Sequence, residues 1–199
     1  MTWENDQQRK KALLYIALVH HPVYNKNMDI IATSVTNLDL HDISRTARTY
    51  DVAGYLILHP HLAQQRLVSE ILRYWTDGYG AEYNPDRKEA LERIEVLTSV
   101  EEAISYIEQK EGRRPQIITT DARIYDNSIS YSGMRKKLQT EEGPWLLLFG
   151  TGFGMEKELM ASADYILHPI WGRGDYNHLS VRSAAAIIID RLLGESWFE

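Results

Sequence analysis

The sequence predicts an α/β fold in which helices flank a mostly parallel sheet. Apolar runs of strand length alternate along the chain with segments of helical periodicity, a pattern typical of consecutive β-α-β units. No internal repeat, low-complexity segment or linker divides the chain. Its length of 199 residues fits one domain with a substantial core. We therefore expect a single domain over residues 1–199.

The first strands and the first helix follow from local patterns. The continuous apolar run "ALLYIALVHH" at 12–21 is typical of a buried strand, and "IIATSV" at 30–35 is either a short strand or an extended loop. Residues 39–50 have helical spacing and begin with Asp39, which is a plausible N-cap. The run "AGYLILH" at 53–59 predicts the next strand.

The middle of the chain continues the alternation. Residues 61–75 predict an amphipathic helix, and Gly, Asn and Pro at 76–86 predict a break after it. A strand at 93–97, a helix at 99–110 and the strand "QIITT" at 116–120 follow.

The last part of the chain adds two more strands and three more helices. A short helix is expected near 132–139, and the apolar run "WLLLFG" at 145–150 predicts a buried strand. A helix near 155–162, the strand "YILHPI" at 165–170 and a final helix near 177–193 complete the order.

The composition excludes several classes of protein. Hydrophobic residues make up 44% of the chain and charged residues 25%, which is typical of a soluble globular protein. The sequence has no cysteine, so disulfides and thiolate catalysis are excluded and an intracellular protein is expected. No apolar run approaches the roughly 20 residues that span a bilayer. We expect a cytoplasmic protein with no membrane partner.

The charge distribution argues against a strongly basic nucleic-acid binder. The net charge is −6, whereas affinity for RNA or DNA depends largely on Lys and Arg. Small basic clusters lie at 9–11, 113–114 and 135–137. Solvated surface is the favoured interpretation of each cluster, and a local basic face is the alternative.

Histidines and aromatic residues are frequent, but their spacing does not predict a metal site. No histidine has a carboxylate partner at a recognisable ligand spacing, so we expect strand-end or cap histidines and no metal. For the aromatic group Tyr74, Trp75, Tyr79 and Tyr83, packing in the core or in a dimer is favoured over stacking on bases.

A glycine-rich turn in "LLLFGTGFGMEKEL" at 146–159 is typical of a nucleotide site, although it comes late in the chain. Dinucleotide-binding folds, and a common methyltransferase fold, place such glycines after the first strand and an acidic residue about 20 residues later. Here the first strand ends in "VHHPVYN", and no Gly-Lys-Ser/Thr follows the glycines as in a phosphate loop. The match to each of these classes is weak.

Three loops at the carboxyl ends of strands predict one shared pocket. They are "TTDAR" at 119–123, "GTGFG" at 150–154 and the segment 169–194. Ligands of open α/β sheets bind outside the carboxyl ends of strands. Glycines in the second loop let the backbone approach a ligand, and the N-terminus of the last helix favours a carboxylate.

The ordered set "TTDAR", "LLLFGTGFG" and "LHPIWGRGDYNHLSVRSAAAI" resembles the three cofactor loops of SPOUT methyltransferases, the α/β-knot RNA methyltransferases that bind S-adenosyl-L-methionine. The segment "DLHDISRTARTYDV" at 39–52 resembles their first motif. The likeness covers most of the chain. It is greatest for the SPOUT domain found alone or fused behind bacterial tRNA (guanine-N1) methyltransferase.

This resemblance implies a C-terminal trefoil knot over about 116–194, a homodimer whose pocket borders the partner subunit, and an RNA substrate. It also implies cofactor-binding residues on the three loops. They are Thr119, Thr120, Ala122, Phe149, Gly150, Thr151, Gly152, Gly154, Leu167, His168, Pro169, Ile170, His178, Leu179 and Ser180. Among them, Phe149, Gly150, Leu167, Pro169, Ile170 and Leu179 are suited to an apolar slot for adenine.

The resemblance also marks Arg45 and Asp39 as candidate catalytic residues. Arg45 falls at the motif arginine, which in related enzymes lies by the methyl-transfer centre, and its alternative is an exposed helical arginine. Asp39 stands where many relatives have asparagine and is a candidate proton acceptor. The sequence departs from the pattern of the family at other positions too. The turn "GTGFG" lacks the glutamate that many relatives have, and His41, Ser180 and Arg182 stand where glycine, asparagine and serine are common.

Three functions remain open from the sequence. The first is an S-adenosylmethionine-dependent methyltransferase acting on tRNA or rRNA. The second is a non-catalytic accessory domain that binds the cofactor and dimerises within an RNA-modifying system, which the acidic charge and the altered motifs favour. The third is a nucleotide-binding protein of the Rossmann type.

Overall fold

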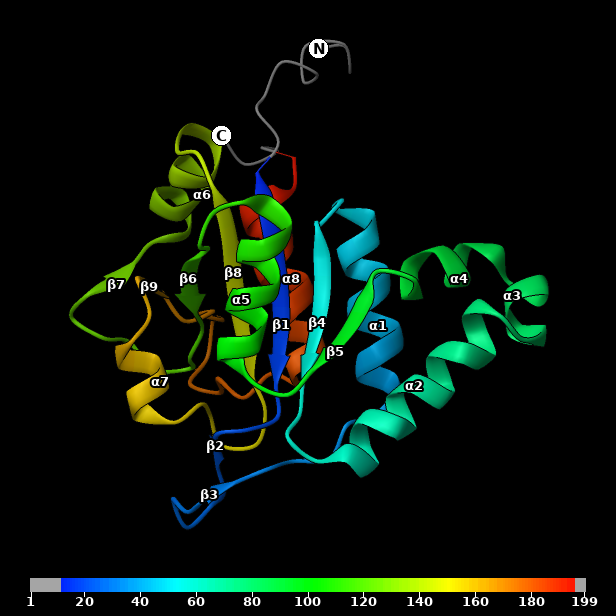
Figure 1. The fold of residues 1–199 in the computed structure, drawn as a ribbon. Coiled ribbons are helices and arrows are strands. Elements are labelled where there is room, and N and C mark those ends of the chain that lie inside the picture. Colours follow the sequence, from blue (N-terminus) through cyan, green and yellow to red (C-terminus); the bar gives the residue numbers. More distant parts are fainter. Residues whose placement is uncertain (1–11, 196–199) are drawn as a thin grey trace.

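The structure is a computed structural model that describes residues 12–195, and it contains a seven-stranded parallel sheet with helices on both faces (Figure 1). The strands of this sheet are β1 (Leu13–Val19), β4 (Gly54–Leu58), β5 (Ile94–Leu97), β6 (Gln116–Thr119), β7 (Ser128–Ile129), β8 (Pro144–Gly150) and β9 (Tyr165–Leu167). Their order is β5-β4-β1-β8-β6-β9-β7, and every pairing is parallel. The mostly parallel α/β fold predicted from the sequence is confirmed.

Two short strands and eight helices complete the described chain. Strands β2 (Val23–Tyr24) and β3 (Ile30–Ile31) form a separate antiparallel hairpin. The helices are α1 (Asn37–Thr49), α2 (Leu62–Thr76), α3 (Tyr79–Tyr83), α4 (Pro85–Leu91), α5 (Val100–Glu111), α6 (Tyr131–Thr140), α7 (Lys157–Ala161) and α8 (Val181–Leu193).

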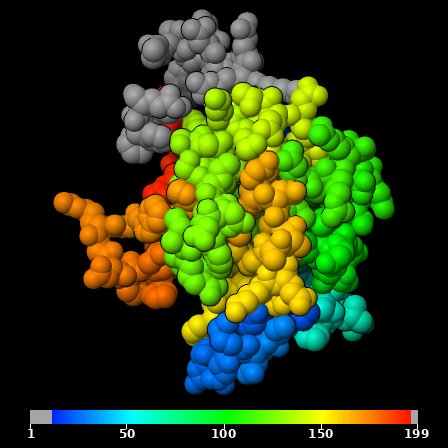
Figure 2. Space-filling model, turned by 90° about the vertical axis from the view of Figure 1, so that its left-hand side faces the viewer, coloured from blue at the N-terminus to red at the C-terminus, as the bar shows by residue number. Residues whose placement is uncertain are grey.

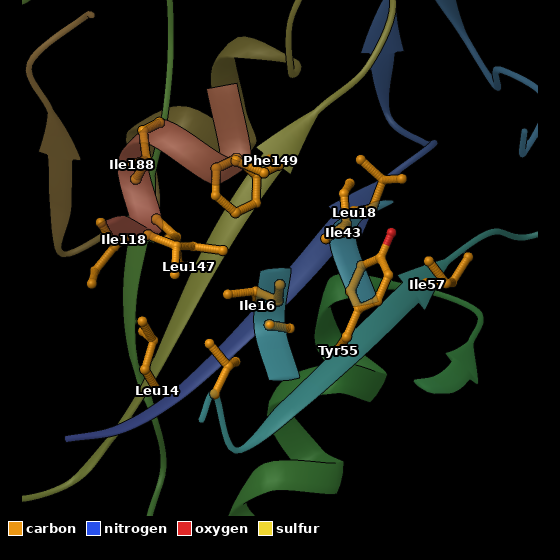
Figure 3. Close-up of a cluster of buried hydrophobic side chains, with 14 of the residues drawn as sticks. Leu14, Ile16, Leu18, Ile43, Tyr55, Ile57, Ile118, Leu147, Phe149 and Ile188 are labelled. Atoms are coloured by element: carbon orange, nitrogen blue, oxygen red, sulfur yellow. The ribbon is translucent and has the colours of Figure 1, made fainter. Parts of the chain in front are cut away.

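The central strands β1 and β8 are buried on both faces, which explains their continuous apolar sequences. Side chains alternate between the faces, so that Leu14, Ile16 and Leu18 contact one cluster and the intervening residues of β1 contact the other. The first cluster includes residues of α6 together with Ile43 of α1 and Ile188 of α8, which Figure 3 labels. The second includes residues of α5 and α7. Helix α8 is therefore part of the core.

Several boundaries differ from those that the sequence predicts. Asp39 is not the N-cap of α1: the cap is Thr36, whose hydroxyl accepts a hydrogen bond from the backbone N–H of Asp39. The last helix begins at Val181, after its N-cap Ser180, and not near 177. The apolar run at 30–35 is a strand only over β3.

The stretch at 76–86 is not simply a break, because it contains α3 and the start of α4. Pro85 occupies the first turn of α4, where its missing N–H costs no hydrogen bond, and the Asn84 side chain caps that helix. Of the nearby aromatic residues, Tyr74, Tyr79 and Tyr83 are exposed, so core packing is wrong for these three. Trp75 is half-buried beneath the Arg87 guanidinium, which lies 4.5 Å from its ring centre.

The basic clusters differ in their environments. Residues 9–11 lie outside the described part of the chain, and Arg113 and Arg114 are exposed. Arg135 is buried and donates hydrogen bonds to the carbonyl oxygens of Arg191 and Gly194 at the end of α8. Solvated surface is therefore the wrong interpretation for Arg135, which ties α6 to α8.

Candidate cofactor pocket

A cavity of about 830 Å³ lies at the carboxyl ends of β6, β8 and β9, between the first turns of α1 and α8. The three loops that the sequence predicts to converge all contribute to its wall. Parts of the segments 33–39, 120–123, 149–154, 168–170 and 177–188 line the cavity. The parallel order of the strands explains this convergence, because all three carboxyl ends lie at the same edge of the sheet.

Most of the predicted cofactor residues line this cavity. They are Thr120, Ala122, Phe149, Gly150, Thr151, Gly152, Gly154, His168, Ile170, His178, Leu179 and Ser180. Thr119, Leu167 and Pro169 do not line the cavity that the described residues form, and all three are buried elsewhere. The Thr119 hydroxyl donates to the Tyr165 carbonyl oxygen at 3.3 Å, and Leu167 belongs to the core cluster that includes α8. These three residues therefore lie behind the cavity wall, and their part in cofactor binding stays a prediction.

The glycine turn after β8 is packed against the β2–β3 hairpin. Phe153 N–H donates to the carbonyl oxygen of Tyr24, and Tyr24 N–H donates to the carbonyl oxygen of Gly154, both at 2.9 Å. Gly152 has a φ of +60°, and a Cβ atom added to it would lie 2.8 Å from the Tyr24 oxygen. In Figure 2 the blue segment with the hairpin lies against the yellow segment that follows β8. Glycine at 152 is therefore required by contact with the hairpin as well as by the backbone conformation.

A chain of hydrogen bonds connects the buried His20 to the glycine turn. The His20 Nδ1 atom lies 3.0 Å from the Thr33 hydroxyl, which lies 2.6 Å from the Thr151 hydroxyl. Thr151 donates to the Val19 carbonyl oxygen at 3.0 Å. Because Thr151 uses its proton there, Thr33 must donate to Thr151, and His20 must donate from Nδ1. This chain fixes the tautomer of His20 and the orientation of Thr151.

His20 and its neighbour His59 are buried and uncharged at neutral pH. Burial is the largest cause that lowers the pKa of His20 to about 4, and the nearby His59 lowers it further. Burial also lowers the pKa of His59, whose Nε2 atom lies 3.0 Å from the Thr33 carbonyl oxygen. The two histidines therefore act as neutral hydrogen-bonding groups under the pocket.

The loop after β6 is held by Asp121, which lines the cavity. Its carboxylate accepts hydrogen bonds from the Arg123 backbone and guanidinium and from the Tyr125 hydroxyl, at 2.8 to 3.1 Å. Burial opposes ionisation of Asp121, but these hydrogen bonds outweigh it and lower the pKa of the carboxyl. Asn177 donates to the Ala122 carbonyl oxygen at 2.7 Å, which joins this loop to the segment before α8.

The two candidate catalytic residues lie in different environments. Asp39 lines the cavity and is 5% exposed, with Oδ1 paired to Arg182 Nη1 at 3.0 Å. Arg45 lies on the exposed side of α1 and does not line the cavity that the described residues form. One chain alone therefore brings Asp39 to the pocket and leaves Arg45 outside it.

The sequence interpretation missed several residues of the pocket wall, including Thr33, Ser34, Thr36, Asp121, Arg123 and Arg182. The polar end of "IIATSV" could have indicated the first two, because polar residues that follow an apolar run at a carboxyl end are common in binding sites.

Among residues 12–195, no group of three His, Asp or Glu side chains could hold a metal ion. In the same range, no helix is long and apolar enough to cross a membrane.

Two known proteins are similar in sequence to most of this chain. An uncharacterised protein from Aquifex aeolicus (strain VF5) is 44% identical over 183 residues, which cover 92% of this chain and 89% of that protein. A tRNA (guanine-N(1)-)-methyltransferase from Oleidesulfovibrio alaskensis is 47% identical over 193 residues, covering 97% of this chain and 45% of that protein. The chain thus spans less than half the length of that methyltransferase.

Solved structures with low sequence identity share the fold. A probable methylase family protein from Haemophilus influenzae Rd KW20 superposes with a TM-score of 0.62 at 16% identity, covering 92% of this chain and 66% of that chain. An AdoMet-bound rRNA methyltransferase from Sinorhizobium meliloti gives a TM-score of 0.52 at 18% identity, covering 94% and 58%. A TrmH/SpoU tRNA modifying enzyme from Aquifex aeolicus gives 0.51 at 17% identity, covering 94% and 76%.

The family model of the SAM-dependent RNA methyltransferases matches residues 13–194, which is nearly the whole described chain. This match confirms the resemblance to SPOUT methyltransferases and the choice of S-adenosylmethionine over a nicotinamide dinucleotide. The chain belongs to the family of S-adenosylmethionine-dependent RNA methyltransferases.

Proposed function

We propose that this protein is an active enzyme of its family and transfers a methyl group from S-adenosylmethionine to a nucleotide of tRNA or rRNA. The observation that carries the proposal is the convergence of three separate loops on one cavity of about 830 Å³. This volume lies within the range of about 300–1,000 Å³ that is usual for small-molecule sites. It is large enough for an adenosyl cofactor together with part of a substrate.

The residues of the cavity fit an adenosyl group. Phe149, Ile170 and Leu179 supply an apolar wall, and the backbone of the glycine turn supplies polar groups at close range. The twelve lining residues predicted from the sequence are the proposed cofactor contacts, and Thr119, Leu167 and Pro169 support them from behind. The turn is held by the hairpin, so little conformational entropy would be lost when a ligand binds.

The bound cofactor would supply a methyl group on a positively charged sulfur, which a nucleophile can attack directly. The protein must then hold the nucleophile in line, exclude water and accept a proton if the nucleophile carries one. We propose that Arg45 orients the RNA nucleotide. Because Arg45 lies outside the cavity of its own chain, it would reach the pocket of a second copy in a homodimer.

The kind of RNA that is methylated is proposed from the names of two relatives. The relatives from Oleidesulfovibrio alaskensis and Nitratidesulfovibrio vulgaris are named tRNA (guanine-N(1)-)-methyltransferases, but this chain matches only 45% and 43% of their lengths. We propose tRNA as the first substrate to test, and the cytoplasm as the place of the reaction.

The alternative function is an accessory domain that binds the cofactor without turnover. The net charge of −6 favours this alternative.

Two measurements on the full chain test this function. Calorimetry should show binding of S-adenosylmethionine and S-adenosylhomocysteine, with NAD and ATP much weaker. Labelled methyl groups should then appear in unmodified tRNA or rRNA. Cofactor binding without transfer to any unmodified RNA pool would favour the accessory domain, and tight NAD binding without a response to the adenosyl ligands would exclude both functions.

A further inference from the structure

An ion pair joins the first turn of α8 to the first turn of α1 at the wall of the cavity. Arg182 Nη1 lies 3.0 Å from Asp39 Oδ1, and Arg182 Nε lies 3.3 Å from Asp42 Oδ2. Arg182 and Asp39 are 143 positions apart in the sequence. Both Arg182 and Asp39 line the cavity, so this contact connects the helix that follows the third cofactor loop to the helix that carries Arg45.

The carboxylate of Asp39 is held by one hydrogen bond to each of its oxygens. Its Oδ2 atom accepts a hydrogen bond from the Thr36 hydroxyl at 2.6 Å, and its Oδ1 atom accepts from Arg182. The Thr36 oxygen in turn accepts from the Asp39 backbone N–H, so side chain and backbone are both restrained. A general base needs a lone pair that can reach the proton of the substrate, and one acceptor position on each oxygen of Asp39 is already taken.

The position of Arg182 is unfavourable for an isolated helix, because cations at the first turn oppose the positive end of the helix dipole. No acidic residue lies in the first turn of α8. The compensating charges come from α1, where Asp39 lies in the first turn and a carboxylate is favoured. The unfavourable interaction of Arg182 with the dipole of α8 is therefore offset by its ion pairs with carboxylates of α1.

We infer that Arg182 is a positioning residue for methyl transfer, and that Asp39 serves as its anchor and not as a general base. The pair sets the separation of α1 and α8, and with it the alignment of the bound nucleotide with the methyl donor. Alignment is sensitive to shifts of about 1 Å, which can cost about a hundredfold in rate. This inference rests on the proposed function, and its structural part is testable without it.

Hydrogen exchange of the ligand-free protein tests the structural part. Arg182→Ala and Asp39→Asn should each speed exchange of the amides whose hydrogen bonds close the first turns of α1 and α8, such as Leu40 and Ala184, at least about tenfold, because the cross-helix contact limits local opening. Arg48→Ala is the matched control, since Arg48 also lies on α1 but pairs with Glu89 of α4, away from the cavity. Unchanged exchange in Arg182→Ala would overturn the inference whether or not the protein is an enzyme.

Kinetics with RNA and S-adenosylmethionine test the positioning role. Arg182→Ala should lower kcat by about ten- to a hundredfold while KM for RNA and cofactor affinity change less than about threefold, because alignment and not binding is lost. Arg182→Lys should restore part of kcat. The double variant Arg182→Ala with Asp39→Asn should be no slower than either single variant, as expected for two residues that act as one unit.

The pH profile separates this role from base catalysis. Asp39→Asn should keep the shape of the parental profile of kcat, because no proton acceptor is removed. Loss of the acid limb in Asp39→Asn, with kcat intact in Arg182→Ala, would show that Asp39 is the base and would overturn the inference. If the parent protein fails to bind the adenosyl cofactor, the proposed function fails instead, and the exchange experiment still decides the structural part.

Discussion

Gly152 lies where the glycine turn after β8 packs against the β2–β3 hairpin. Gly152→Val should destabilise the fold by about 2 kcal/mol or more, because a β-branched residue is strained at positive φ and its Cβ would lie 2.8 Å from the Tyr24 oxygen. It should also weaken S-adenosylmethionine binding by displacing the turn. Thermal unfolding and calorimetry measure the two effects. Gly174→Val is the control, since no atom lies within 4 Å of its added Cβ, and equal behaviour of both variants would contradict the packing described.

Because His20 is buried and uncharged, we expect the folded protein to lose stability in acid. Its pKa is about 4 in the folded chain and about 6.5 when unfolded, so the unfolded state binds the proton first as pH falls. The stabilisation is complete above pH 6.5 and is lost towards pH 4. Between pH 7.5 and 5 the free energy of unfolding should fall by about 2 kcal/mol on account of His20, and burial of His59 should add to this.

Urea unfolding at the two pH values measures the contribution of His20. His20→Asn should remove about 2 kcal/mol of the pH dependence, since the amide can still donate to Thr33 but does not titrate. His61→Gln, at an exposed histidine, should leave most of the dependence in place. An unaltered slope in His20→Asn would show that other groups cause the acid sensitivity.

At the scale of elements, the cap of α8 links stability to binding. The Ser180 hydroxyl caps α8 and lines the cavity, whereas Ser99 caps α5 away from it. Ser180→Ala and Ser99→Ala should each cost about 1 kcal/mol of stability. Only Ser180→Ala should also weaken S-adenosylmethionine binding, as measured by calorimetry. Equal affinity in the two variants would place the cofactor away from the start of α8.

The elements that the sequence predicts well are those whose own residues carry the signal. Strands β1 and β8 are buried on both faces, so their sequences are continuously apolar. Strand β7 has only two residues and exists through its pairing with β9, which no local pattern encodes. Helix α4 did carry a signal, an asparagine followed by proline, but the same residues also occur in loops.

The candidate site is predictable where it depends on strand order. Loops that follow parallel strands meet at one edge, so the three segments could be grouped before their contacts were known. Within a segment, the direction of each side chain determines whether the residue lines the cavity. Thr119 points away from the cavity that its neighbour Thr120 lines. The Asp39–Arg182 pair depends on how α1 packs beside α8, and sequence spacing contains no such information.

At the scale of the whole molecule, the final helix is needed for the fold. Ala185, Ile188, Ile189 and Leu192 are buried in the main core cluster, so a chain ending at Asp164 should lose cooperative unfolding as well as cofactor binding. The resemblance to SPOUT enzymes further predicts that this part of the chain, about 116–194, is knotted. A folded fragment 1–164 that still binds S-adenosylmethionine would contradict both expectations.

The proposed role of Arg45 in methyl transfer requires a second copy of the chain. Arg45 lies outside its own cavity, and apolar side chains near the cavity are unusually exposed, with Leu38 at 57% and Leu179 at 46%. A second copy packed over these residues would cover them and bring its Arg45 towards the pocket. We therefore expect a dimer in sedimentation. Arg45→Ala should retain cofactor affinity and lose methyl transfer.

Mixed dimers decide which subunit supplies Arg45. Ile170→Arg should place a charge in the apolar wall and abolish cofactor binding, which calorimetry can verify. An equal mixture of Arg45→Ala and Ile170→Arg chains, exchanged to equilibrium, should recover about a quarter of parental activity, since half of the dimers then contain one complete site of two. If Arg45 serves the pocket of its own chain, every site in the mixture lacks one component and no activity returns. The recovered fraction therefore distinguishes a shared site from two independent ones.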